Sequence, residues 1–542
     1  MKKRNSFFFS CLLPFLMMAP LYAQEEEGGG KARHDADEDQ AVFYISDVAY
    51  QITGRTKAWA ASRAAQINEG EEIAGKTKLE KYIKDKEQTL LNTRVLESVR
   101  IAYTVGEPEE GGKIPVYLVV ELVDTRNLIA LPEPKYSTSE GLDVELKIRD
   151  YNFLGTMQPL RLDIGYMLDE DHWDNGKDIA RQAWDEGSIM FSIDSDTPFK
   201  FMGFQWNFNF DHELAYTFGE PLYYKNTTGV SMDIPWRRTT ITIGFEQSFI
   251  FNEENGTVYQ NEFGEFAPFY TSSALISSWK VPLGLEAGGF GEITYTPKIT
   301  WKINCNFTEL DELRKGPALT FSHRLGFGKI NWFENFRNGL DASFDNSNTY
   351  NMYRNDWSVD YSAGAQAHKK IASFFGVSGR LSFNQWFFTN NFKSGRYPAY
   401  TEVGSKLRGV RDNTLIAENA GFMLLLNADF PLQILHFTPS EWFGVKALRY
   451  FNFDMHVSPF IDAALLQGKR EVSWSGGRYT DWKDSRFSSA PVCAAGFEII
   501  FFPLAWRSFY VRLSVGYNIN KIIETGKMPG YDEIFIGVGH HY

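Results

Sequence analysis

The chain has 542 residues, of which 43% are hydrophobic and 16% aromatic, and this is the composition of an ordered protein rather than a disordered one. Its 55 lysines and arginines stand against 68 aspartates and glutamates. The resulting formal charge of −13 argues against nucleic-acid binding, which needs a basic surface. The three cysteines, Cys11, Cys305 and Cys493, form no CxxC pair and are too few for a disulfide framework, so the sequence predicts neither zinc nor thiol chemistry.

Residues 1–23 have the pattern of a secretory signal peptide. A basic start at residues 2–4 precedes an apolar run over residues 7–22, and the small residue Ala23 stands at the predicted cleavage site. The run is interrupted by proline and is too short for a spanning helix, which needs about 20 apolar residues. Residues 24–40 are an acidic tail for which we expect disorder. No later apolar stretch can span a membrane as a helix, so a soluble secreted protein and a β-barrel both remain open here.

Residues 41–125 predict a small α+β domain. Strands are expected at 42–53, 98–104 and 115–122, because these stretches are rich in β-branched and aromatic residues. Helices are expected at 56–67 and 77–92, where apolar residues recur near the helical period. Thr77 and Glu80 have the spacing of a capping box at the start of the second helix. The predicted order is β-α-α-β-β.

From residue 135 to residue 542 the pattern is one strand after another with a period of two. Leu142, Val144, Leu146 and Ile148 alternate with charged residues, and similar segments recur to the end of the chain. A closed transmembrane barrel explains both faces, because apolar side chains then face lipid while polar ones face a watery lumen. We therefore predict an all-β transmembrane barrel of about 16 antiparallel strands, with fourteen or eighteen also compatible.

The barrel is expected to close between a first strand near 141–151 and a last strand near 533–542. Gly537 and Gly539 favour a weak closure, because glycine lowers strand stability. The predicted residues of this seam are Leu142, Val144, Ile536, Val538 and Tyr542.

Several short motifs carry a resemblance to a known family. The stretch Leu90–Val99, read as LLNTRVLESV, resembles part of a POTRA domain, and Asn152–Gly155 resembles the first barrel turn of the same family. Leu407-Arg408-Gly409-Val410 resembles the VRGY/F motif on the sixth outer loop. This family is the BamA/TamA/two-partner-secretion superfamily of outer-membrane assembly factors and translocases, also called the bacterial surface antigen family. The resemblance implies a single POTRA domain at 41–125 in the periplasm and a barrel in the outer membrane.

The resemblance also implies a partner for Arg408. Residues 460–464 are similar to the family's F-x-D-x-G pattern, and strand parity directs Phe460 and Asp462 toward the lumen. A loop arginine and a wall carboxylate can then form a charge-assisted bond inside a partly desolvated lumen. Arg408, Gly409, Phe460 and Asp462 are thus the predicted residues of a loop-six latch. An ordinary salt bridge of a barrel interior is the alternative reading.

Three further sequence patterns resemble ligand-binding or metal-binding sites, but each has a simpler explanation. Residues 70–77 match a phosphate-binding loop letter for letter, yet no strand leads into the glycines and an exported protein meets no nucleotide pool. His540 and His541 are adjacent strand residues and point to opposite faces, which disfavours a metal site. The acidic residues 169–172 are better explained as a solvated loop than as a calcium cage. We predict no metal and no cofactor.

The expected function is assistance to the insertion or translocation of other polypeptides at the outer membrane. Its partners would be outer-membrane lipid, unfolded β-rich client polypeptides and accessory periplasmic proteins, and not nucleic acid. No catalytic constellation is present in the sequence, so we do not expect an enzyme. A diffusion porin or a structural surface barrel without a client is the main alternative, and a secreted soluble β-protein is a third.

Overall fold

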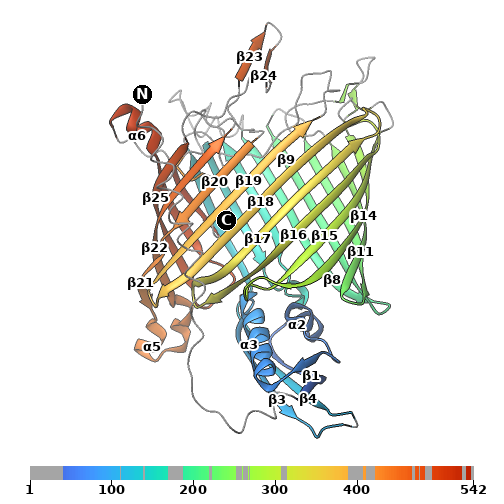
Figure 1. The fold of residues 1–542 in the computed structure, drawn as a ribbon. Coiled ribbons are helices and arrows are strands. Elements are labelled where there is room, and N and C mark those ends of the chain that lie inside the picture. The colour runs from blue at the N-terminus through green and yellow to red at the C-terminus, as the bar shows by residue number, and fades with distance from the viewer. Residues whose placement is uncertain are drawn as a thin grey trace, which may run out of the picture.

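The computed structural model describes sixteen stretches of the chain (Figure 1). These are residues 41–109, 111–137, 141–168, 187–218, 222–251, 259–260, 266–267, 269–306, 310, 314–388, 407–409, 422–466, 470–474, 477–481, 491–527 and 533–538. The predicted signal peptide and acidic tail therefore lie outside the described residues, as do residues 169–172, 540–541 and Tyr542.

Residues 41–125 form the N-terminal unit, a four-stranded sheet with two helices. The elements are β1 (Val42–Thr53), α2 (Ala58–Ala65), β2 (Glu72–Ala74), α3 (Lys76–Asn92), β3 (Leu96–Val105) and β4 (Lys113–Asp124). The sheet order is β2-β1-β4-β3, with β1 and β4 parallel. Leu79 and Leu90 on α3 are fully buried beside sheet residues such as Ile45 and Val116. The helices and sheet thus bury one shared apolar core.

Two details of this unit differ from the sequence-based expectation. The short strand β2 was not predicted, and it pairs with the start of β1 through Ile73 and Phe43. The expected capping box of Thr77 and Glu80 is wrong, because α3 begins at Lys76 with Gly75 as its N-cap and no side-chain cap. The pattern at 70–77 therefore contains a strand, which a phosphate-binding loop does not.

The rest of the described chain is a closed antiparallel barrel, so the predicted fold class is confirmed. Its strands, in the order of the chain, are β5 (Leu128–Ser137), β6 (Gly141–Asp150), β7 (Leu160–Leu168), β8 (Ser188–Phe201), β9 (Phe204–Thr217), β10 (Tyr223–Trp236), β11 (Thr239–Phe251), β14 (Phe269–Glu286), β15 (Glu292–Cys305), β16 (Ala318–Phe333), β17 (Phe336–Asn351), β18 (Asp356–Ala372), β19 (Phe375–Phe388), β20 (Phe422–Asp429), β21 (Leu432–Phe437), β22 (Phe453–Leu466), β25 (Val492–Pro503), β26 (Val511–Asn518) and β27 (Glu533–Val538).

Short helices and hairpins lie in the connections between the barrel strands. They are η3 (Phe153–Gly155), the hairpin of β12 (Tyr259–Gln260) and β13 (Phe266–Ala267), α5 (Pro439–Phe443), η6 (Lys446–Phe451), the hairpin of β23 (Arg470–Trp474) and β24 (Gly477–Asp481), and α6 (Ile519–Thr525). The N-terminal unit lies at one end of the barrel, which we call the near rim; the opposite end is the far rim (Figure 1).

Within the described residues the barrel has eighteen strand positions rather than sixteen. β20 and β21 occupy one position, because both pair with β19 and β22 and only Phe430 and Pro431 separate them. Counted from β5, the connection from β19 to β20 is the seventh at the far rim. The predicted sixth position of the Arg408 loop is therefore wrong by one hairpin.

The closure of the barrel also differs from the expected seam. β27 lies next to β5, which begins at Leu128 and was not predicted as a strand. Leu142 and Val144 are on β6, one strand away from the closure, so their assignment to the seam is wrong. Ile536 and Val538 are on β27, where they pair with β26.

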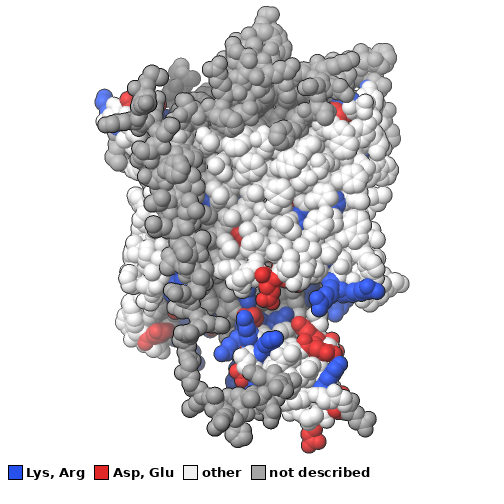
Figure 2. Space-filling model, viewed as in Figure 1, with Lys and Arg blue, Asp and Glu red and all other residues white. Residues whose placement is uncertain are grey.

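The wall of the barrel shows the predicted alternation of faces. On β22 the residues Phe460, Asp462 and Ala464 are buried inside, whereas Ile461 is 49% exposed on the outside. Figure 2 shows a wall that is almost uncharged, with Lys, Arg, Asp and Glu gathered where the N-terminal unit meets the near rim. This distribution is that of a transmembrane barrel.

Among the described residues, no helix is long and apolar enough to cross a membrane.

Candidate functional site

The side chain of Arg408 lies inside the barrel wall and is bound by Asp462. The Nε and Nη2 atoms of Arg408 donate to the two carboxylate oxygens of Asp462, at 2.9 and 2.7 Å. The backbone N–H of Arg408 also donates to Asp462, at 3.1 Å. Arg408 is 1% exposed and Asp462 is fully buried. The planar guanidinium thus makes a two-pronged bond that a lysine could not reproduce.

Two more carboxylates and an aromatic ring complete the environment of Arg408. Its Nη1 atom donates to Asp429 on β20 at 2.6 Å and forms an ion pair with Glu498 on β25 at 3.2 Å. The guanidinium carbon lies 3.8 Å from the centre of the Phe460 ring, a cation–π contact. We call this cluster of Arg408, Gly409, Asp429, Phe460, Asp462 and Glu498 the Arg408 latch.

The neighbouring residues of the loop pack against the wall. Leu407 is fully buried among Met423, Leu425, Ala464 and Ala494. Gly409 has a positive φ of 79° and lies against β26, where an added Cβ would come within 2.5 Å of the Tyr517 nitrogen. Only glycine accepts both this backbone conformation and this close approach.

The electrostatics of the cluster favour a fixed arrangement. Removing a guanidinium and several carboxylates from water costs several kcal/mol per ion, and this cost is offset only when each charge is paired with good geometry. The Arg408 latch meets this condition, since the guanidinium contacts three carboxylates and an aromatic face. Beside Arg408, a cavity of about 40 Å³ leaves room for a few water molecules.

Sequence reasoning located part of this cluster. Arg408, Gly409, Phe460 and Asp462 are brought together, whereas Val410 lies outside the described residues. Their role as a latch of the lumen remains a prediction. Asp429 and Glu498 were missed, although strand parity places both on the buried face, where each is the one acidic residue of its strand.

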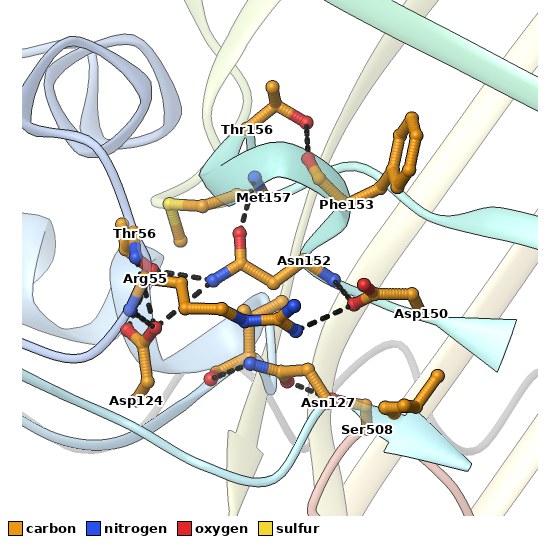
Figure 3. A network of polar contacts seen from close by, with 12 residues as sticks. Arg55, Thr56, Asp124, Asn127, Asp150, Asn152, Phe153, Thr156, Met157 and Ser508 are labelled. Carbon is orange, nitrogen blue, oxygen red and sulfur yellow. Dashed lines mark hydrogen bonds and ion pairs between the residues drawn. The ribbon is translucent and has the colours of Figure 1, made fainter.

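A second set of polar contacts joins the N-terminal unit to the near rim (Figure 3). Asn152, in the turn between β6 and β7, is fully buried and donates to Thr56 at 2.8 Å and to Asp124 at 3.2 Å. Arg55 forms an ion pair with Asp150 at 3.0 Å. The N–H of Met157 donates to the Asn152 side chain at 2.9 Å, which fixes the turn.

Backbone contacts support the same junction. The N–H of Lys57 donates to the carbonyl of Gly155 at 2.9 Å. Gly155 has a positive φ of 76°, and a Cβ there would collide with the carbonyl of Arg55. The turn at 152–155 is therefore shaped for the N-terminal unit.

Two other turns of the near rim hold the end of α3. Asn92 donates to Asn331 at 2.9 Å and accepts from the N–H of Trp332 at the same distance. The guanidinium of Arg94 lies 4.2 Å from the Trp332 ring. Ser508 donates to the Arg94 carbonyl at 2.8 Å. Contacts at three separate hairpins hold the unit against the rim, and only the motif at 152–155 was recognisable from the sequence.

The chain was compared with known proteins. No family model matches, and no curated protein matches. The chain is similar in fold to CdiB from Acinetobacter baumannii, with 12% identity, a TM-score of 0.43 and coverage of 92% of this chain and 73% of that chain. CdiB from Escherichia coli matches with 10% identity, a TM-score of 0.39 and coverage of 98% and 96%. BamA from Haemophilus ducreyi lacking POTRA domains 1–3 matches with 12% identity, a TM-score of 0.33 and coverage of 92% and 84%. At these values the likeness concerns the fold, so the function is argued from the geometry of the chain itself.

Proposed function

We propose that this protein is an outer-membrane barrel that assists the insertion or translocation of other polypeptides. In this proposal the N-terminal unit is a single POTRA-type domain in the periplasm, and the far rim faces the outside of the cell. The client is an unfolded, β-rich polypeptide, and accessory periplasmic proteins deliver it.

The observation that carries the proposal is the inward position of Arg408. A diffusion porin works through an unobstructed lumen, so a loop anchored inside the wall by buried charges opposes that function. A structural barrel without a client needs no anchored loop and no unit across its near rim. A barrel that opens only for a client is expected to have both features.

The N-terminal unit offers a site for an extended client. Its sheet ends at β3, a strand of ten residues that pairs with β4 on one side. An edge strand of this length can accept a polypeptide by strand addition, in which backbone hydrogen bonds supply the affinity.

The closure between β27 and β5 is the proposed exit. β27 has six residues and β26 has eight, whereas β14 has 18. Because each backbone pair contributes to the ladder, the short strands make this part of the wall easier to separate than the long ones.

Crosslinking across the closure tests the proposal. Cysteine pairs are placed on β5 and β27 and, as a control, at Leu325 and Phe344 of the paired strands β16 and β17, in a variant whose two mature cysteines are replaced by serine. Gel shift after heating reports folding, and appearance of client polypeptides in the outer membrane or medium reports function. We expect oxidation to stop client handling at the closure but not in the control. Unchanged client handling with a crosslinked closure would exclude the proposed exit, and large steady conductance without a client would favour the porin.

A further inference from the structure

Strand β26 touches the Arg408 latch at two places. Its lumen-facing residues are Arg512, Ser514, Gly516 and Asn518, which are all buried. Gly516 packs directly on the backbone of Gly409, because a Cβ on Gly516 would lie 2.6 Å from the Gly409 Cα. Arg512 reaches the latch through Glu498.

Glu498 links the two arginines through a single oxygen atom. Its Oε1 accepts from Nη1 of Arg512 at 2.9 Å and lies 3.2 Å from Nη1 of Arg408. Glu498 is 3% exposed and Arg512 is 4% exposed. In such a dry environment a shared carboxylate ties the positions of its two partners together, because moving either one leaves charge poorly compensated.

Both contacts fall on the part of β26 that supports the last barrel strand. β26 pairs with β27 over Val511–Gly516, where Arg512 lies opposite Gly537 and Gly516 lies opposite Glu533. The two latch contacts therefore stand near the two ends of this six-pair ladder. Residues 407–409 therefore act on one end of this ladder directly, through Gly516, and on the other through Glu498 and Arg512.

The charge balance gives Arg512 a distinct role. Arg408 and Arg512 face three carboxylates, those of Asp429, Asp462 and Glu498. When Arg408 withdraws, Glu498 keeps Arg512 as its partner, whereas Asp462 loses the guanidinium that bonds both of its carboxylate oxygens. Arg512 thus stays bonded to Glu498 and holds its carboxylate in position for the return of the loop.

We propose that β26 couples the Arg408 latch to the β27 closure, with Arg512 and Gly516 as the positioning residues. Release of residues 407–409 then loosens β27, and separation of β27 weakens the hold on the loop. The coupling is a property of the barrel alone and needs no client, so it can fail while the proposed function stands.

Hydrogen–deuterium exchange of the full folded chain in nanodiscs tests this coupling. The readouts are peptides that contain β27, with β17 as an internal reference. Arg512→Gln and Gly516→Ala are compared with two controls. Arg354→Gln removes an arginine that pairs with Asp356 at the start of β18, and Gly364→Ala adds a methyl group where no atom lies within 4 Å.

We expect Arg512→Gln to speed exchange in β27 by about tenfold, the loss of one charge-assisted bond, while β17 is unchanged. Gly516→Ala should also speed exchange in β27, because its methyl group would displace the backbone of Gly409. Arg512→Lys should restore part of the protection, because it keeps a positive charge beside Glu498. In a Glu498→Gln background, Arg512→Gln should have little further effect on β27, since the link is already broken.

The proposal is overturned if Arg512→Gln changes β27 no more than Arg354→Gln, or if it speeds exchange in β17 and β27 equally. Should Arg512→Gln not fold, Arg512→Lys and Gly516→Ala supply the same comparison. Exchange in β27 that matches the controls in both of these variants would also overturn it.

Discussion

Gly409 and Gly516 lie back to back where the loop meets the barrel wall. An added methyl group on either residue would come within 2.7 Å of the backbone of the other. Arg408 precedes this contact by one residue, so the approach of the two glycines sets how deeply the guanidinium enters the cluster of carboxylates. Arg408 thus reaches its carboxylates because neither Gly409 nor Gly516 has a side chain that would keep the loop away from the wall.

Gly409→Ala should displace the loop. The new Cβ would overlap the backbone of β26, and alanine is also disfavoured at a φ of 79°. Overpacking of this kind costs about 1–3 kcal/mol in the free energy of unfolding. Conductance in planar bilayers should rise, and urea unfolding should begin earlier. Gly364→Ala on β18 is the matched control, and equal conductance of the two variants would contradict the expectation.

Asp462→Ala should be among the most destabilising single changes in the barrel. Asp462 accepts three hydrogen bonds from Arg408, and its removal leaves a buried guanidinium short of a partner. Breaking a buried pair in this way costs about 3–5 kcal/mol. Urea unfolding followed by tryptophan fluorescence measures the loss.

Asp194→Ala provides the comparison for that experiment. Asp194 pairs with Arg161, but both side chains are about half exposed, so solvent screens the pair and the loss should stay below about 1 kcal/mol. Similar losses for Asp462→Ala and Asp194→Ala would mean that the Arg408 pair contributes no more than a surface contact.

The sequence alone predicted most strands, because lipid on one side and a polar lumen on the other impose a period of two. It missed β5, in which Pro132 and Pro134 interrupt the expected strand composition, and this omission moved the predicted seam to β6. It also missed β2, since three residues carry almost no periodicity.

The candidate site was predicted only where a motif existed. The pair Arg408 and Asp462 followed from a family resemblance, whereas Asp429, Glu498 and Arg512 did not. These three residues lie on β20, β25 and β26, and their meeting point depends on the register between strands. Side-chain periodicity tells which face a residue occupies, but not the height at which it stands along the barrel.

Asn152→Ala should free the N-terminal unit from the β6–β7 turn. The change removes the bonds to Thr56 and Asp124 and the acceptor for the Met157 N–H, all in a buried site. Each buried group left without a partner costs about 1–3 kcal/mol. Spin labels on the unit and on the barrel should then give a broader distance distribution in double electron–electron resonance.

Asn346→Ala is the control for this experiment. Asn346 is a barrel asparagine that donates to the Asp360 carbonyl, and its replacement should leave the distance distribution narrow. An unchanged distribution in Asn152→Ala would show that the other two turns suffice to hold the unit.

Tyr82 should make the stability of the N-terminal unit sensitive to alkali. Burial raises the pKa of Tyr82, and the hydrogen bond that its hydroxyl donates to Glu71 at 2.8 Å raises it further. The unfolded chain releases this proton near the ordinary pKa of 10, while the folded chain retains it. The stabilisation is therefore complete below pH 10 and is lost as the pH rises above 10 toward the pKa of the folded state.

The matched variant for this prediction is Tyr82→Phe. Lys86, whose ammonium lies 4.7 Å from the Tyr82 ring, is present in both proteins, so its own titration largely cancels in the comparison. At pH 8 the variant should be weaker by about 0.5–1.5 kcal/mol for the lost hydrogen bond. Between pH 10 and pH 11 the wild type should lose resistance to subtilisin faster than the variant, with cleavage of the N-terminal unit as the readout. Parallel loss in the two proteins would place the alkaline sensitivity on another group, because phenylalanine has no proton to release.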